Sequence, residues 1–140
     1  MITLELKIII RKPTNMQKYR VEIDDNGDVY WYKHNTKQLH RIDGPAVEDA
    51  NGDKCWYQNG QRHRIDGPAV ERANGDCYWY QNGKRHRIDG PAIEWANGAK
   101  YWYIEGKNLS EKEFLQRTST CNGKIIEYEG NKYKLQLVEE

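Results

Sequence analysis

Residues 63–85 read HRIDGPAVERANGDCYWYQNGKR, and this stretch of 23 residues is one of three consecutive copies. The copies begin at His40, His63 and His86; the first two agree at 19 of 23 positions, and the third differs from the second at seven. A fixed period of this length is typical of repeat proteins, because so short a unit cannot bury a core alone and packs on its neighbours. We therefore expect a stack of equivalent units that presents a surface rather than one asymmetric catalytic pocket.

Each copy carries two turn signals, Ala-Asn-Gly in the middle and Asn-Gly or Glu-Gly near the end. Two turns in 23 residues predict two strands per repeat. The first strand is expected at Pro45–Glu48 and its equivalents, with proline at the strand start, where a missing N–H does least harm. The second is expected to centre on Trp56, Trp79 and Trp102. The predicted fold is mainly β, an elongated antiparallel meander of 23-residue β-hairpin repeats.

The residues before the repeats predict capping strands. Apolar residues alternate from Ile2 to Ile8, and 19–24 reads as a second strand that ends at the turn 25–28. Asn26-Gly27 in that turn favours a hairpin, because this pair tolerates positive φ at both central positions. A degenerate first copy begins here, with two extra residues in the 34–38 loop, so we assign 1–25 to the N-terminal strands and 26–108 to the hairpin repeats.

The pattern changes after residue 108. Ser110-Glu-Lys-Glu113 is a capping-box signature and predicts a helix that ends near Gln116 or Arg117. Two strands, 124–129 and 132–138, are predicted to form a final hairpin around Gly130-Asn131. We assign 109–140 to this C-terminal helix and hairpin cap and treat 1–140 as a single domain.

Composition limits the function classes. The 140 residues are 37% apolar with a formal net charge of +1, and residues 40–106 hold nine Lys/Arg against ten Asp/Glu, a balance of −1. This balance argues against non-specific nucleic-acid binding. The longest apolar run, 8–10, is too short for a membrane span or a signal peptide. Three cysteines without a C-x-x-C pair favour a reducing compartment, so we expect a cytoplasmic protein.

Catalytic and metal sites are not expected. Equivalent histidines of successive copies lie two strands apart, roughly 9–10 Å at the usual strand spacing, which is too far for one metal ion. Cys55 and Cys77 sit one position apart in the repeat and should face opposite sides of the sheet. The copies contain no serine or threonine to act as a nucleophile. The prediction is a protein that is not an enzyme and has no metal and no cofactor.

Recognition remains for the repeated polar and aromatic positions. An arginine in each repeat presents a planar fork that suits anions or carboxylates. The candidate binding residues are His40, Arg41, His63, Arg64, His86, Arg87, Tyr57, Tyr80 and Tyr103. The structural alternative is that each arginine pairs with the aspartate two residues on or with the Glu48/Glu71/Glu94 row, and that the Trp column is a core stripe.

The repeat resembles a known family. Tyr78-Trp-Tyr-Gln-Asn-Gly-Lys-Arg-His, followed by Ala96-Asn-Gly, is similar to the membrane occupation and recognition nexus (MORN) repeat, a 23-residue β-hairpin unit. The match covers about residues 26–108, with His-Arg-Ile-Asp-Gly-Pro-Ala in place of the usual His-Gly-x-Gly. This variant, with its Leu-Ser-Glu-x-Glu-Phe helix and Cys-Asn-Gly-Lys tail, resembles a group of short proteins encoded by tailed bacteriophages. The resemblance implies an extended sheet used as a scaffold or binding surface, and implies no enzyme activity.

The function expected from the sequence is binding. The phage resemblance favours an accessory protein that binds and inhibits a host defence protein, and no membrane partner is expected. Two alternatives stay open. Arginines and aromatic residues can hold a small nucleotide, which would make this a nucleotide-sequestering protein. Sheet edges can instead support a self-assembling scaffold, a homo-oligomer of this chain.

Overall fold

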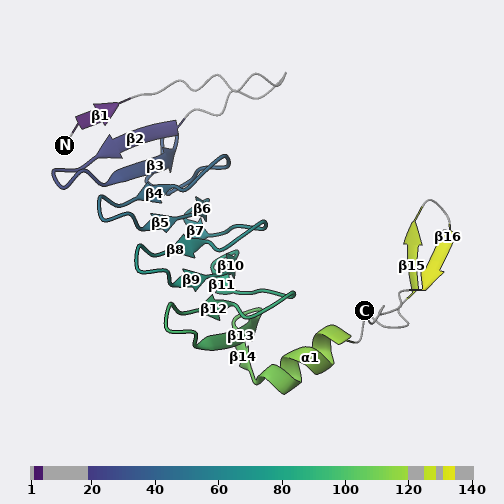
Figure 1. Cartoon of the computed structure of the whole chain (residues 1–140). Coiled ribbons are helices and arrows are strands. Elements are labelled where there is room, and N and C mark those ends of the chain that lie inside the picture. Colours follow the sequence, from purple (N-terminus) through teal and green to yellow (C-terminus); the bar gives the residue numbers. More distant parts are fainter. Residues whose placement is uncertain (1, 5–18, 120–124, 129–130, 135–140) are drawn as a thin grey trace.

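The computed structural model describes residues 2–4, 19–119, 125–128 and 131–134. The protein is mainly β: ten antiparallel strands form one sheet in the order β1-β2-β3-β4-β5-β8-β9-β12-β13-β14. Successive repeats add two strands each, so the hairpins stack along one axis (Figure 1). The expected antiparallel stack of hairpin repeats is confirmed.

The strands of the large sheet are short. They are β1 (Ile2–Leu4), β2 (Tyr19–Ile23), β3 (Val29–Lys33), β4 (Val47–Glu48), β5 (Lys54–Cys55), β8 (Val70–Glu71), β9 (Cys77–Tyr78), β12 (Ile93–Glu94), β13 (Lys100–Ile104) and β14 (Lys107–Leu109). Two small hairpins lie beside it, β6 (Tyr57–Gln58) with β7 (Gln61–Arg62) and β10 (Tyr80–Gln81) with β11 (Lys84–Arg85).

The chain leaves the large sheet at the repeat tryptophans, which the sequence did not predict. The backbone N–H of Trp56 donates to Ala69 O in the next repeat (2.8 Å), whereas Trp56 O accepts from the N–H of His63 (3.1 Å). Trp79 makes the same pair of bonds with Ala92 and His86. The predicted second strand is therefore split at Trp56 and at Trp79. Each of the first two copies has four short strands rather than the predicted two. Only around Trp102 is it continuous, as β13.

The two turn signals of each repeat form different turns. Asn59 and Gly60 both have positive φ (51° and 79°), which is the geometry of a tight two-residue hairpin turn. In the Asn-Gly turns of the large sheet, such as Asn26-Gly27, positive φ is confined to the glycine (89° at Gly27). The predicted hairpin turn between β2 and β3 is present, with positive φ used at Gly27 alone. Asp24 Oδ1 stabilises this turn by accepting the N–H groups of Asn26 and Asp28.

The core is a narrow stripe repeated along the sheet. Neighbouring residues of the first strand are buried on both sides of the sheet: Ala46, Ala69 and Ala92 are 0% exposed, and Val47, Val70 and Ile93 are 8%, 2% and 5% exposed. Alanine leaves room for the adjacent backbone, while the branched side chains pack with residues such as Cys55 and the repeat tyrosines. Each unit therefore depends on its neighbours for burial.

An aspartate connects each repeat to the next. Asp28 Oδ1 accepts the N–H of Ala50 (2.7 Å), Asp53 Oδ1 that of Ala73 (2.7 Å), and Asp76 Oδ1 that of Ala96 (2.8 Å). Asp53 also pairs with Arg72. The third copy has Ala99 at this position. No further repeat follows to donate an N–H group to this position. This gives one physical reason why the last copy lacks the aspartate of the earlier copies.

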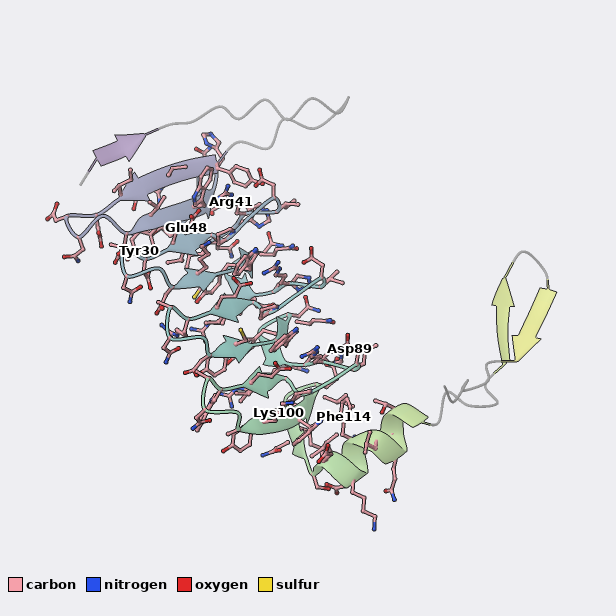
Figure 2. All side chains as sticks on the ribbon, viewed as in Figure 1. Tyr30, Arg41, Glu48, Asp89, Lys100 and Phe114 are labelled. Atoms are coloured by element: carbon pink, nitrogen blue, oxygen red, sulfur yellow. The ribbon has the colours of Figure 1, made fainter. Side chains whose placement is uncertain are left out.

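The two ends of the stack differ. At the N-terminal end, β1 pairs with β2 and β2 with β3, as the predicted strand pair requires. At the C-terminal end, α1 (Glu111–Ser119) begins with the predicted capping box, in which Ser110 Oγ accepts the N–H of Glu113 and Glu113 Oε2 accepts the N–H of Ser110. Phe114 of α1 is buried (4% exposed) at the last strands (Figure 2).

The final hairpin is present as β15 (Ile125–Tyr128) and β16 (Asn131–Lys134), which pair with each other in a separate sheet. Its role as a cap stays a prediction. The predicted strand ends at 5–8, 124, 129 and 135–138 lie outside the described residues. Within the described ranges, no helix is long and apolar enough to cross a membrane.

The aspartate contact between repeats predicts an asymmetric mutational result. Asp53→Ala removes an acceptor from the Ala73 N–H and a partner from Arg72, and should lower the free energy of unfolding by about 1–3 kcal/mol. Ala99→Asp is the matched control, because no following repeat donates to it, and should change stability by less than about 0.5 kcal/mol. Chemical denaturation of both variants measures this difference, and equal effects would contradict the inter-repeat role.

Candidate functional site

The repeated arginines lie at the junctions between repeats. The Arg64 guanidinium stacks over the ring of Trp56 in the preceding repeat, with Cζ 4.1 Å from the ring centroid. Its Nε donates to Asp66 (3.0 Å), and its Nη1 donates to Glu71 (2.8 Å) and to Pro68 O (3.2 Å). Arg41 and Arg87 repeat this arrangement over Trp31 and Trp79 (3.9 and 4.1 Å). Figure 2 shows Arg41 near Glu48, with which it pairs at 2.9 Å.

The glycine of each Asp-Gly-Pro segment is needed by this arginine. A Cβ built on Gly67 would lie 2.9 Å from Arg64 Cζ, and one on Gly44 would lie 2.8 Å from Arg41 Cζ. Neither glycine has positive φ, so the reason is close approach rather than backbone conformation. The guanidinium is held between an indole ring on one side and a glycine backbone on the other.

The sequence left open whether each repeated arginine pairs with the aspartate two residues on or with the strand glutamate. These contacts show that it pairs with both at the same time. Two carboxylates surround each guanidinium, and its hydrogen bonds hold the loop against the sheet. The arginine lowers the pKa of the Asp66 and Asp89 carboxyls through these hydrogen bonds. A phosphate would have to compete with both carboxylates, which disfavours Arg41, Arg64 and Arg87 as anion ligands.

The histidines bind the hairpin turns of their own repeats. Nδ1 of His40 accepts the backbone N–H of Asn59 (2.9 Å), and Nδ1 of His63 accepts that of Asn82 (3.1 Å). His86 Nδ1 lies 3.1 Å from both the N–H and the Oε1 of Glu105. Accepting an N–H requires the unprotonated nitrogen, so the rings of His40 and His63 are neutral when they hold the turn.

The tyrosine row is interleaved with a second set of arginines. Arg62 Cζ lies 5.9 Å from the Tyr57 ring centroid and 5.4 Å from that of Tyr80, and Arg85 Cζ lies 5.3 Å from that of Tyr103. The Nε of Arg85 also donates to Tyr80 Oη (3.2 Å). Tyr57, Tyr80 and Tyr103 are half-buried. Their rings therefore help to hold the small hairpins together.

Three strongly exposed apolar residues lie on the loops that the arginines hold. Ile42, Ile65 and Ile88 are 56%, 79% and 64% exposed. We call the surface of the three segments 41–45, 64–68 and 87–91 the loop face; Figure 2 shows Asp89 at the tip of the third loop. These isoleucines were not among the residues predicted from the sequence, although an apolar residue at the same place in three polar turn segments was the available signal.

Two similar grooves separate the three loops. The first, of about 530 Å³, lies between the loops of Ile42 and Ile65, and Trp56, Gln58 and His63 form part of its wall. The second, of about 590 Å³, lies between the loops of Ile65 and Ile88. Trp79, Gln81 and His86 occupy the matching wall positions there. Of the predicted set, Arg41, His63 and Arg64 line the first groove, and Arg64, His86 and Arg87 line the second. His40 and the three tyrosines line neither groove.

Neither of the two described cysteines is activated as a nucleophile. Burial raises the pKa of the Cys55 and Cys77 thiols, which keeps both protonated and poorly nucleophilic at neutral pH. The two residues pair with different partners, Val47 and Val70 for Cys55 and the Glu71/Glu94 row for Cys77, as expected for opposite sides of the sheet. No group of three or more His, Cys, Asp or Glu suited to a metal occurs in the described part of the chain.

Comparison with protein-family models, curated proteins and solved structures finds no match to this chain. The similarity to MORN repeats therefore rests on the repeat motif itself.

The arginine sandwich can be tested with a double-mutant cycle. Gly67→Ala should destabilise the protein because the new methyl group displaces the Arg64 guanidinium from Trp56 and its carboxylates. In an Arg64→Ala background the same substitution meets no guanidinium and should cost much less. We expect a coupling free energy of about 1 kcal/mol or more, measured by denaturant unfolding of the four proteins. Additive effects would show that the glycine serves another purpose.

Protonation of His40 should destabilise the fold. Burial lowers the pKa of His40 from its ordinary 6.5, and nearby Lys33 adds to the effect. The unfolded chain then binds more protons than the folded one, so this contribution to stability is present above about pH 6.5 and is lost as the pH falls towards the lowered pKa. The free energy of unfolding should fall more between pH 7.5 and 5.5 for the wild type than for His40→Gln. Parallel pH profiles would contradict this coupling.

Proposed function

We propose that this protein is a non-enzymatic binding protein that contacts a partner protein through the loop face. The observation that carries the proposal is the row of exposed isoleucines. The same repeats bury other apolar residues almost fully, namely Val47, Val70 and Ile93. The isoleucines are therefore not exposed for want of a core. Ile65, at 79% exposure, gains almost nothing from folding. Apolar side chains presented side by side on a surface favour a contact with another molecule.

The loops are suited to this role because they are rigidly held. Each isoleucine directly follows an arginine that is fixed by an indole ring, two carboxylates and a carbonyl oxygen. A held loop loses little conformational entropy on binding, which favours affinity. The arginine therefore positions the contact residue rather than serving as the main contact.

The partner that we propose is a bacterial host protein. The resemblance of the His-Arg-x-Asp-Gly-Pro-Ala repeats to phage-encoded proteins supports an accessory role in infection, in which binding inhibits a host defence protein. Acting on such a target would place the protein in the host cytoplasm. Sequestering a nucleotide is less favoured, because each repeated arginine already pairs with two carboxylates.

One observation supports the self-assembling alternative. Trp95 and Tyr101, on the last repeat, are 40% and 37% exposed, and their ring centroids lie 5.3 Å apart. Trp95 stands where the earlier copies have Asp49 and Arg72. This aromatic pair is a surface through which a second copy could associate, and sedimentation at increasing concentration would reveal it as a rising mass.

A triple substitution tests the loop face. Ile42→Ser/Ile65→Ser/Ile88→Ser should leave the free energy of unfolding within about 0.5 kcal/mol per site, because the side chains are exposed. Leu115→Ser is the matched control, since Leu115 is also 56% exposed but lies on α1. We expect a host protein captured stoichiometrically from bacterial lysate by the wild type and the control, and lost by the triple variant. Capture that is equal for all three would place the contact elsewhere.

A further inference from the structure

The spacing of the loops restricts the shape of a ligand that lies along them. Each repeat contributes two strands to the large sheet, so equivalent positions recur about every 9.6 Å at a strand spacing near 4.8 Å. A ligand that uses both grooves in the same way must present equivalent side chains, on one face, at this interval.

A polyproline-II helix meets this condition best among regular conformations. It has three residues per turn and a rise of about 3.1 Å, so every third residue points to the same side at about 9.3 Å intervals. A β-strand has a suitable length over three residues, but residues i and i+3 point to opposite faces. In an α-helix the residues that share a face with i are i+3 and i+4, at about 4.5–6 Å, and i+7, at about 10.5 Å, which falls out of register by almost 2 Å over two repeats.

The groove walls also suit an extended peptide backbone. A polyproline-II segment makes no internal hydrogen bonds, so its carbonyl oxygens need donors. The first groove has such groups in its wall, the indole of Trp56, the amide of Gln58 and the ring of His63. Because Nδ1 of His63 accepts the Asn82 N–H, the neutral ring carries its proton on Nε2. The aromatic and proline surface beside these donors is of the kind that binds proline-rich segments.

The charge of the loop face indicates the sign of the net charge that a ligand should carry. Each arginine of the loop face pairs with two carboxylates, the aspartate of its loop and a glutamate of the adjoining strand, as in the group of Arg64, Asp66 and Glu71. Arginines and aspartates balance within the loops, and the strand glutamates bring the total over three repeats to three positive against six negative charges, a balance of −3 with neutral histidines. The aspartates of the last two loops are also largely exposed, at 85% for Asp66 and 76% for Asp89. A basic ligand is therefore complementary to this surface.

From these observations we propose that the loop face binds a basic, proline-rich segment in the polyproline-II conformation. Apolar residues of the segment, one in every three, lie in the grooves beside Ile42, Ile65 and Ile88, and lysine or arginine residues face the carboxylates. This inference rests on the proposed function, since it names the chemistry of the partner segment that the loop face would contact.

Synthetic peptides test the proposal directly. The probe is a fluorescein-labelled peptide of repeated Pro-Pro-Arg units long enough to cross all three loops, and binding is followed by fluorescence anisotropy at low ionic strength. A peptide of repeated Gly-Ser-Arg units with the same length and charge is the flexible control, and one of repeated Pro-Pro-Glu units is the charge control. We expect the first to bind about ten-fold or more tighter than the flexible control, because less conformational entropy is lost.

Protein variants locate the site. The triple isoleucine-to-serine variant should lose most of the affinity for the Pro-Pro-Arg peptide, and Leu115→Ser should keep it. Equal affinity for the proline-rich and flexible basic peptides would show simple charge attraction and overturn the proposal. Unchanged affinity in the triple variant would also overturn it, by placing the peptide elsewhere.

The possible outcomes distinguish a failure of this inference from a failure of the proposed function. If the triple variant loses a captured host protein but the peptides show no preference for polyproline II, the loop face is a binding surface for another kind of partner and only this inference fails. If the triple variant retains every captured protein, the proposed function fails as well.

Discussion

The contact between an arginine and the tryptophan of the preceding repeat is the interaction on which this architecture depends. The guanidinium of Arg64 lies between Trp56 and the backbone of Gly67, and its hydrogen bonds reach Asp66, Glu71 and the carbonyl of Pro68. One side chain thus connects two repeats and closes a loop. Its close approach also explains why position 67 is a glycine. A cation over an indole face contributes about 0.5–2 kcal/mol depending on its desolvation, and charge-assisted hydrogen bonds add to this.

This contact helps to explain how so thin a protein can be ordered. The two small core clusters, around Trp31 and around Val70, are built from few buried residues, and most aromatic rings are only half-buried. Polar interactions between neighbouring repeats supplement the apolar burial. They are the arginine stacks and the aspartate acceptors at Asp28, Asp53 and Asp76. Within each repeat, the histidine adds a further hydrogen bond by accepting a turn N–H group.

The fold class could be read from the sequence because the period and the turn residues are local signals. Asn-Gly pairs, the proline two residues before the first strand of each repeat and the Ser110/Glu113 capping box all act within a few residues. The split of the strand at Trp56 could not be predicted, since it follows from hydrogen bonds to Ala69 and His63 in the next repeat. The sequence also singled out the segments that form the loop face. The exposure of their isoleucines could not be predicted, because it depends on the adjacent arginines turning inwards onto the tryptophans.

Successive repeat junctions make nearly the same contacts, and the exception at Ala99 lies in the last copy. This arrangement has an evolutionary consequence. The contacts at one junction are almost identical to those at the next, whereas the features specific to the ends lie outside the internal copies. Duplication or deletion of one internal 23-residue unit therefore changes the length of the array without creating a new kind of junction. Each added unit would supply one more groove, so selection can adjust how long a stretch of partner is contacted by changing copy number, with no new residue required at any existing position.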